Sequence, residues 1–128
     1  MIEMEIVGTY RSQSGDFVIE ISKSDDSVGT FSGTYTARAT PEGMQQFLLV
    51  SGSWGFINNP NGKRIPLNIS LIALIRPNSW NYCIYDAWAG VLVEDGTILA
   101  TGVRSYLKAG EPAQLSSLGI HTFINIYK

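Results

Sequence analysis

The stretch YDAWAG, Tyr85–Gly90, places an acid between aromatic rings inside a run that otherwise has the composition of a β-strand. Alternate side chains of a strand point to opposite faces, so Asp86 shares its face with Ile84 and Trp88. Neither face of the run is clearly polar. The surrounding segments therefore decide whether Asp86 lies inside a closed barrel or on a solvated face.

Strand-like segments recur along the whole chain. They are short, rich in Val, Ile, Thr and aromatic residues, and separated by Gly, Asn, Asp and Pro. The predicted strands are Glu5–Ser12, Asp16–Ser22, Gly29–Ala39, Gln46–Phe56, Ile65–Arg76, Trp80–Val93, Ile98–Leu107 and Gly119–Tyr127. The pairs Asn61-Gly62 and Asp95-Gly96 predict hairpin turns. Only Ala113–Leu118, in a polar connection before the last strand, suggests a single helical turn.

Eight consecutive strands with hairpin links predict an all-β fold, an eight-stranded antiparallel up-and-down barrel. Closing the sheet removes the unpaired edges that an open sheet exposes. The length of 128 residues fits one domain with one core, so we expect a single barrel domain over residues 1–128. A β-sandwich is the main alternative, and the short length disfavours a lipocalin-like barrel.

Composition argues against several classes of function. The net charge is −2 and Lys and Arg are scattered, so nucleic acid is not expected as a partner. Cys83 is the only cysteine, which excludes an internal disulfide and a zinc cluster. No apolar run reaches the roughly 20 residues of a membrane span. The acidic start of the chain lacks the basic region of a signal peptide, so we expect a cytoplasmic location, or secretion after removal of a signal.

The second half of the chain has no clearly polar strand face. In the strand predicted over Ile65–Arg76, Ile69 and Leu71 share one face while Ile72 and Leu74 lie on the other. No helix is predicted that would cover the outside, so we expect a second subunit to cover it. The sequence therefore predicts a homo-oligomer, a dimer or a tetramer, assembled through strands five to eight. Charged residues in the first three strands indicate a solvated outer face there.

Five motifs, taken in order, resemble those of the avidin and streptavidin family. They are GTY at Gly8–Tyr10, GTYTA at Gly33–Ala37, VSGSW at Val50–Trp54, AWAG at Ala87–Gly90 and LGIHTF at Leu118–Phe123. The match runs over nearly the whole chain and agrees in the number and order of strands. The resemblance implies a non-enzymatic barrel that binds a small molecule, biotin in the family, at one mouth and that assembles into an oligomer.

Carried over residue by residue, the resemblance implies six ligand-binding positions, Ser12, Asp16, Tyr35, Asp86, Trp88 and His121. The first three stand where the family has donors to the ureido oxygen of biotin, although an ionised Asp16 can only accept. Trp88 falls on a pocket tryptophan of the family. Asp86 stands where the family keeps a threonine, and His121 stands roughly where it has an aspartate.

The family's other pocket tryptophans are missing. Their positions fall near Ala73, Gly102 and Ala113, the last of which a neighbouring subunit supplies in the family, and Ile84 replaces a serine. A buried aromatic wall covers about 150–250 Å² and dominates the energetics of such a site. Its loss at three positions predicts that biotin does not bind tightly. We expect a remodelled pocket for another small molecule, polar or cationic and bearing a ring.

One alternative remains open for the interior. Asp86 and His121 pair there with each other or with backbone groups and fill the barrel, leaving an oligomeric interaction or scaffold domain without a small ligand. A histidine, a carboxylate and the hydroxyls of Ser12 or Tyr35 are also the parts of an acid–base site. No nucleophile motif such as GxSxG is present, however. We therefore predict no catalytic residue, no cofactor and no metal site.

Overall fold

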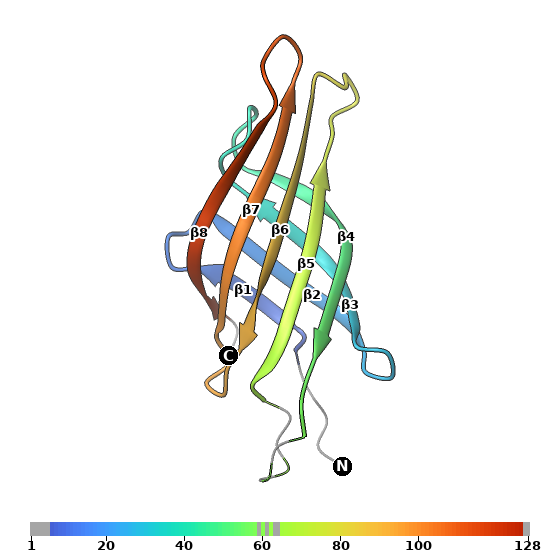
Figure 1. Cartoon of the computed structure of the whole chain (residues 1–128), viewed down its shortest axis with the longest axis vertical. Helices are drawn as coiled ribbons and strands as arrows, with labels where there is room; N and C mark the ends of the chain where they lie inside the picture. Colours follow the sequence, from blue (N-terminus) through green and yellow to red (C-terminus); the bar gives the residue numbers. More distant parts are fainter. Residues whose placement is uncertain (1–5, 59, 61, 63–64, 127–128) are drawn as a thin grey trace.

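The computed structural model describes residues 6–58, 60, 62 and 65–126. Eight antiparallel strands follow one another around a closed barrel, and β1 pairs with β8 to complete it (Figure 1). The strands are β1 Gly8–Ser12, β2 Phe17–Asp25, β3 Thr30–Ala37, β4 Gln45–Gly55, β5 Leu67–Ile75, β6 Tyr82–Leu92, β7 Ile98–Lys108 and β8 Gln114–Asn125. The predicted all-β up-and-down barrel is confirmed, and the sandwich alternative is wrong. Within the described residues, no helix has the length and apolar character needed to span a membrane.

Alternate side chains of each strand pack the interior. Along β6 the buried positions include Tyr82, Ile84, Asp86 and Trp88, while the residues between them are at least partly exposed. Asp86 is 0% exposed, so the acid of the YDAWAG stretch lies inside the barrel. A buried carboxylate must be paired or hydrogen-bonded, and its partners therefore define the centre of the molecule.

The connections after β1, β3, β5 and β7 lie at one end of the barrel, called the mouth end here (Figure 1). They comprise residues 13–16, 38–44, 76–81 and 109–113. At the opposite end, the predicted Asp95-Gly96 turn joins β6 to β7, with Gly96 at φ 87°. The backbone N–H of Val93 donates there to the carbonyl of Thr97 at 2.9 Å. The other predicted hairpin pair includes Asn61, which lies outside the described residues.

The last strand begins earlier than predicted. β8 starts at Gln114 rather than at Gly119, and the expected helical turn over Ala113–Leu118 is wrong because this segment pairs with β7. The pairing shifts next to Gly119, whose φ is 84°, so a bulge interrupts the alternation that marks a strand. The residues from Gln114 to Ser117 are all exposed, which explains why this part of the strand has a polar sequence.

Trp80 lies in the turn before β6 and not at the start of the strand, as the sequence predicted. Its φ is 58°, an uncommon conformation for a bulky residue. Its backbone N–H donates to the carbonyl of Pro77 at 2.9 Å. The Arg76 guanidinium lies 3.8 Å from the centroid of the indole. The tryptophan is thus held on the outside of the mouth end, where it is 69% exposed.

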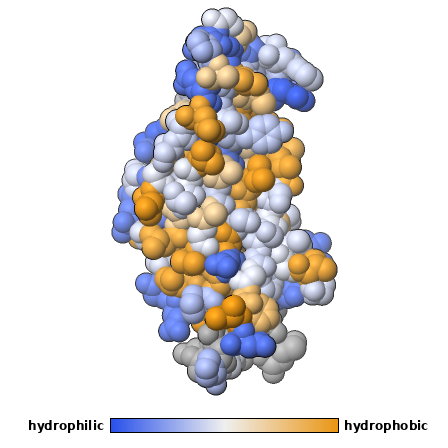
Figure 2. Space-filling model, viewed as in Figure 1, coloured by the Kyte–Doolittle hydropathy of each residue, from blue (hydrophilic) through white to orange (hydrophobic). Residues whose placement is uncertain are grey.

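The outer surface has two halves. Outward residues of β1 and β2, among them Arg11, Glu20 and Lys23, are exposed and charged, in agreement with the expected solvated face. The outward residues of β4 to β8 form an apolar outer face that includes Leu48, Val50, Ile72, Tyr85, Leu99, Val103, Leu107, Leu115, Ile120 and Ile124, each at least 42% exposed. Figure 2 shows apolar side chains gathered on the side that these strands present.

Candidate functional site

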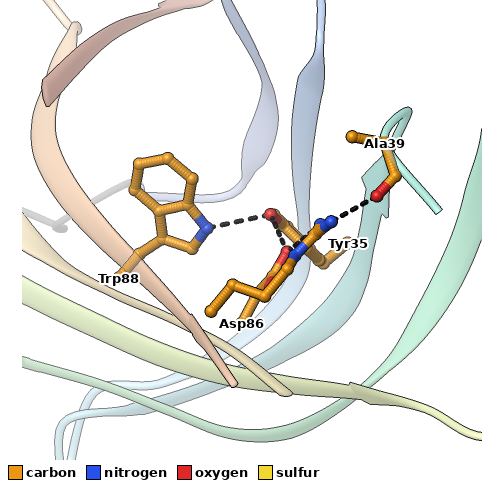
Figure 3. Close-up of polar contacts among 5 residues, drawn as sticks. Tyr35, Ala39, Asp86 and Trp88 are labelled. Carbon is orange, nitrogen blue, oxygen red and sulfur yellow. Dashed lines mark hydrogen bonds and ion pairs between the residues drawn. The ribbon is translucent and has the colours of Figure 1, made fainter. Parts of the chain in front are cut away.

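A chain of hydrogen bonds runs through the centre of the barrel, from Trp88 to the loop after β3 (Figure 3). Trp88 Nε1 donates to the Tyr35 hydroxyl at 2.9 Å, and this hydroxyl donates to Oδ2 of Asp86 at 2.8 Å. Arg104 donates from Nε to Oδ1 of Asp86 at 2.7 Å and from Nη2 to Oδ2 at 2.8 Å. Its Nη1 donates to the carbonyl of Ala39. Tyr35, Asp86, Trp88 and Arg104 are called the central network below.

The ion pair between Arg104 and Asp86 in the central network is bidentate and buried. The side chains of Arg104 and Asp86 are 9% and 0% exposed. Burial alone would lower the pKa of Arg104, but the hydrogen bonds and the charge of Asp86 outweigh this effect and raise it. Burial also raises the pKa of Tyr35, and the charge of Asp86 raises it further, so the phenol remains a neutral donor. Two parallel charge-assisted hydrogen bonds make this one of the stronger contacts that a protein can form.

Strand register positions these groups. Asp86 and Arg104 are Cα partners across β6 and β7, and Trp88 is the partner of Gly102. The indole of Trp88 covers Gly102 so closely that a Cβ there would lie 2.7 Å from the ring. Gly102 stands where the resemblance placed a second pocket tryptophan, so the space for that ring is taken by Trp88.

Phe17, at the start of β2, occupies the space between three of the predicted site residues. Its ring centroid lies 5.0 Å from that of Trp88, 5.1 Å from His121 and 6.4 Å from Tyr35. His121 is half-buried and its Nε2 lies 2.7 Å from the carbonyl oxygen of Leu118. A direct pair between Asp86 and His121, one option for a filled interior, is therefore wrong, because Asp86 is paired with Arg104. His121 instead contacts a backbone group, which was the other option.

Ser12 and Asp16 flank the turn between β1 and β2. The Ser12 hydroxyl is buried, accepts from the N–H of Phe17 at 3.1 Å and shares a hydrogen bond with the Ser14 hydroxyl at 2.9 Å. The backbone carbonyl of Asp16 accepts from the N–H of Arg38 at 3.0 Å. Both residues thus shape the turn that brings Phe17 into the barrel.

The structure divides the six predicted positions into two groups. Hydrogen bonds join Tyr35, Asp86 and Trp88 directly. His121 contacts Trp88 only edge to face, with ring centroids 5.7 Å apart, and also packs against Phe17. Ser12 accepts from the backbone of Phe17, and Asp16 directly precedes that residue. Sequence reasoning missed Phe17 and, more importantly, Arg104. A signal for Arg104 was present: Leu92 and Ile98 flank the Asp95-Gly96 turn as partners, and counting outward along both strands reaches Asp86 opposite Arg104.

The buried polar atoms find their hydrogen-bond partners within the chain. In the described residues, every buried side-chain nitrogen or oxygen has a hydrogen-bond partner. The same part of the chain contains no group of three or more His, Cys, Asp or Glu residues arranged to hold a metal ion. The arrangement is therefore a self-contained polar core, and its groups offer few vacant hydrogen-bonding positions to a ligand deep in the barrel.

A hollow of about 300 Å³ lies at the mouth end, next to the guanidinium of Arg104. One wall is the loop after β3, and the rest comes from inward positions of β6, β7 and β8. The lining residues are Ala39, Thr40, Pro41, Ile84, Arg104, Tyr106, Lys108, Gln114 and Ser116. The loop wall is held by the bond from Arg104 to Ala39 and by the bond at 2.7 Å that the Tyr82 hydroxyl donates to Glu42. The hollow is thus bounded by tethered elements.

Comparison with known proteins identifies the fold. The crystal structure of core-bradavidin is similar to this chain with a TM-score of 0.64 and 20% sequence identity, and the match covers 91% of this chain and 96% of that chain. No protein-family model and no curated protein matches the sequence. The barrel is avidin-like, and the resemblance drawn from the five motifs is confirmed at the level of the fold.

Proposed function

We propose that this chain, which has the avidin-like fold, is a non-enzymatic binding barrel that holds a small molecule at its mouth end and does not bind biotin tightly. The observation that carries the proposal is the central network. Tyr35, Asp86 and Trp88 stand at positions that the resemblance assigns to the biotin pocket, and their polar atoms are bonded to one another and to Arg104. Biotin would have to break a buried ion pair to reach them.

The mouth-end hollow supports binding of a ligand above this network. Ligand sites commonly lie in the mouths of β-barrels, where a few polar groups converge on a partly apolar cleft. The hollow of about 300 Å³ is at the lower limit of common ligand pockets, which suits a small ligand. Its residues come from one loop and three strands, so the ligand would rest on rigid elements.

The apolar outer face supports self-association as the state in which the barrel acts. Monomeric proteins rarely expose contiguous apolar patches larger than a few hundred Å². A homo-oligomer formed through β5 to β8 would cover residues such as Ile72, Val103 and Ile120, which are exposed in the single chain.

The same face favours a second candidate, an oligomeric interaction or scaffold domain with a filled interior and no small ligand. In this alternative the central network and Phe17 serve only as core, and the outer strands and loops carry the function. The two candidates differ in whether any small molecule occupies the mouth end.

A thermal-shift screen of the purified protein against soluble small molecules, with biotin included, tests the proposal. Hits would be confirmed by isothermal titration and by the fluorescence of the three tryptophans. The expected result is stabilisation by at least one compound other than biotin, lost in Ser116→Trp, which fills the hollow from β8. Tight and saturable biotin binding would overturn the proposal, and a screen without any confirmed binder would replace it with the interaction domain.

A further inference from the structure

Arg104 has donors that the central network does not use. A guanidinium carries five N–H groups. Three of them donate to Asp86 and to the carbonyl of Ala39. Two N–H groups therefore remain, on a side chain that lines the mouth-end hollow and is 9% exposed.

The lining of the hollow is cationic on one side and contains no acid. Among its nine residues, Arg104 and Lys108 carry positive charges and none is Asp or Glu. Asp86 is 0% exposed, so its charge faces the guanidinium and not the hollow. Two acids lie nearby with partners of their own: Glu42 accepts from Tyr82 at 2.7 Å, and Glu111 lies 3.3 Å from Lys108.

The Lys108–Glu111 pair does not remove Lys108 from use by a ligand. Both side chains are more than two-fifths exposed, at 42% and 44%, and exposed pairs of this kind contribute little to stability. A bound anion can therefore replace Glu111 as the partner of the Lys108 ammonium group at a small cost in free energy.

Uncharged donors complete the hollow. Tyr106 lies opposite Ile84 and Gln114, and Ser116 lies opposite Arg104, so these side chains stand in adjacent rows of β6, β7 and β8. In the part of the chain that the structure describes, the side chains of Tyr106, Gln114 and Ser116 form no hydrogen bond, and all three line the hollow. Hydroxyl and amide groups at these positions can donate to oxygen atoms of a ligand.

We infer that the mouth-end hollow binds a small oxyanion, a carboxylate or a phosphate ester, through Arg104 and Lys108. This inference rests on the proposed function and names its ligand class. It differs from the polar or cationic ligand expected from the sequence, because that expectation counted the carboxylate of Asp86 and did not include Arg104. Arginine recognises such groups because its fork of donors matches their geometry.

Three probes of one shape test the inference, namely benzoate, phenyl phosphate and the neutral benzamide. Each is titrated into the isotopically labelled protein while the amide and guanidinium NMR signals are followed. The expected result is a saturable shift of the Arg104 and Ser116 signals for one or both anions. The affinity derived from that shift should be at least 10-fold higher than the affinity for benzamide. The stronger of the two anions identifies the carboxylate or the phosphate as the natural group.

Variants separate charge from shape. Lys108→Gln should weaken binding of the anion about 2- to 5-fold, the effect of a partly exposed cation, and leave the affinity for benzamide unchanged. Lys23→Gln, which removes one exposed charge from β2, is the matched control. It should leave the affinities for the anion and for benzamide unchanged. Arg104 itself is not replaced here because its loss would disturb the core.

The outcomes distinguish the inference from the function. Equal affinity for benzamide and the anions, or anion shifts confined to residues outside the hollow, would overturn the oxyanion site. If a neutral compound from the screen binds in the hollow, the proposed function stands without this ligand class. If no compound of any class binds there, both fail together.

Discussion

Arg104 illustrates how one residue decides the character of this interior. The guanidinium neutralises Asp86, anchors the loop after β3 and faces the mouth-end hollow. The YDAWAG stretch alone does not predict this arginine partner, because a lone carboxylate on an aromatic face is compatible with both an open pocket and a filled core. Composition and local pattern therefore located the acid, and only the partner across the sheet explains why it is buried.

Removing one member of the ion pair should be costly. Arg104→Met leaves Asp86 buried without compensation, and we expect the free energy of unfolding to fall by about 3–5 kcal/mol in urea titrations. The double variant Asp86→Leu/Arg104→Met removes both charges, so its free energy of unfolding should fall less than that of the single variant. Arg38→Met, an exposed position, serves as the control. Equal losses in the single and double variants would show that packing, and not the uncompensated charge, dominates.

Tyr82 should make stability depend on alkaline pH. Burial, together with the bond to Glu42, raises the pKa of Tyr82 from 10.0 to about 12. The folded state therefore favours the protonated phenol, and the resulting stability is complete below pH 10 and is lost as the pH rises towards about 12. Unfolding titrations in this window should show a steeper loss for the wild type than for Tyr82→Phe. Tyr35 is present in both proteins, so parallel curves would refute the role of Tyr82.

At the scale of the element, alternation and turn residues predicted all eight strands, whereas boundaries failed where local geometry broke the pattern. Gly119 introduces a bulge that hides the first part of β8. Trp80 adopts a positive φ, so β6 begins at Tyr82 and not at Trp80. Of the candidate site, the inward positions on β3 and β6 were predictable from alternation. Arg104 required the register of a hairpin, and Phe17 required knowledge of how the first turn enters the barrel.

Gly102 should tolerate no side chain. A Cβ at this position would lie 2.7 Å from the Trp88 ring, so Gly102→Ala forces the indole to shift and should destabilise the barrel by about 1–3 kcal/mol. Gly55→Ala is the control, because a Cβ there meets nothing within 4 Å. We expect this control to be neutral or slightly stabilising. Thermal unfolding followed by tryptophan fluorescence measures both, and an unperturbed Gly102→Ala protein would show that Trp88 is free to move.

At the scale of the whole molecule, the barrel is asymmetric. Its β1 to β3 side carries charged and hydroxyl residues outward, while rows such as Ile72, Ala87 and Val103 place small and apolar side chains next to one another across β5, β6 and β7. A shallow hollow of about 390 Å³ is lined by these three residues and their neighbours, as expected for a surface that accepts the side chains of another subunit. Sequence alone suggested this face, because the second half of the chain lacks polar alternation.

Charge placed on the apolar outer face should therefore dissociate the protein. Ile72→Glu and Val103→Glu introduce carboxylates at positions that are each 42% exposed in the single chain, so the fold should persist while the buried interface becomes unfavourable. Light scattering after size exclusion should give the wild type a multiple of the chain mass of 14.0 kDa and both variants the mass of one chain. Thr36→Glu, on the polar half of the barrel, should remain associated. A wild type that is monomeric at micromolar concentration would refute self-association and leave the apolar outer face to a different partner.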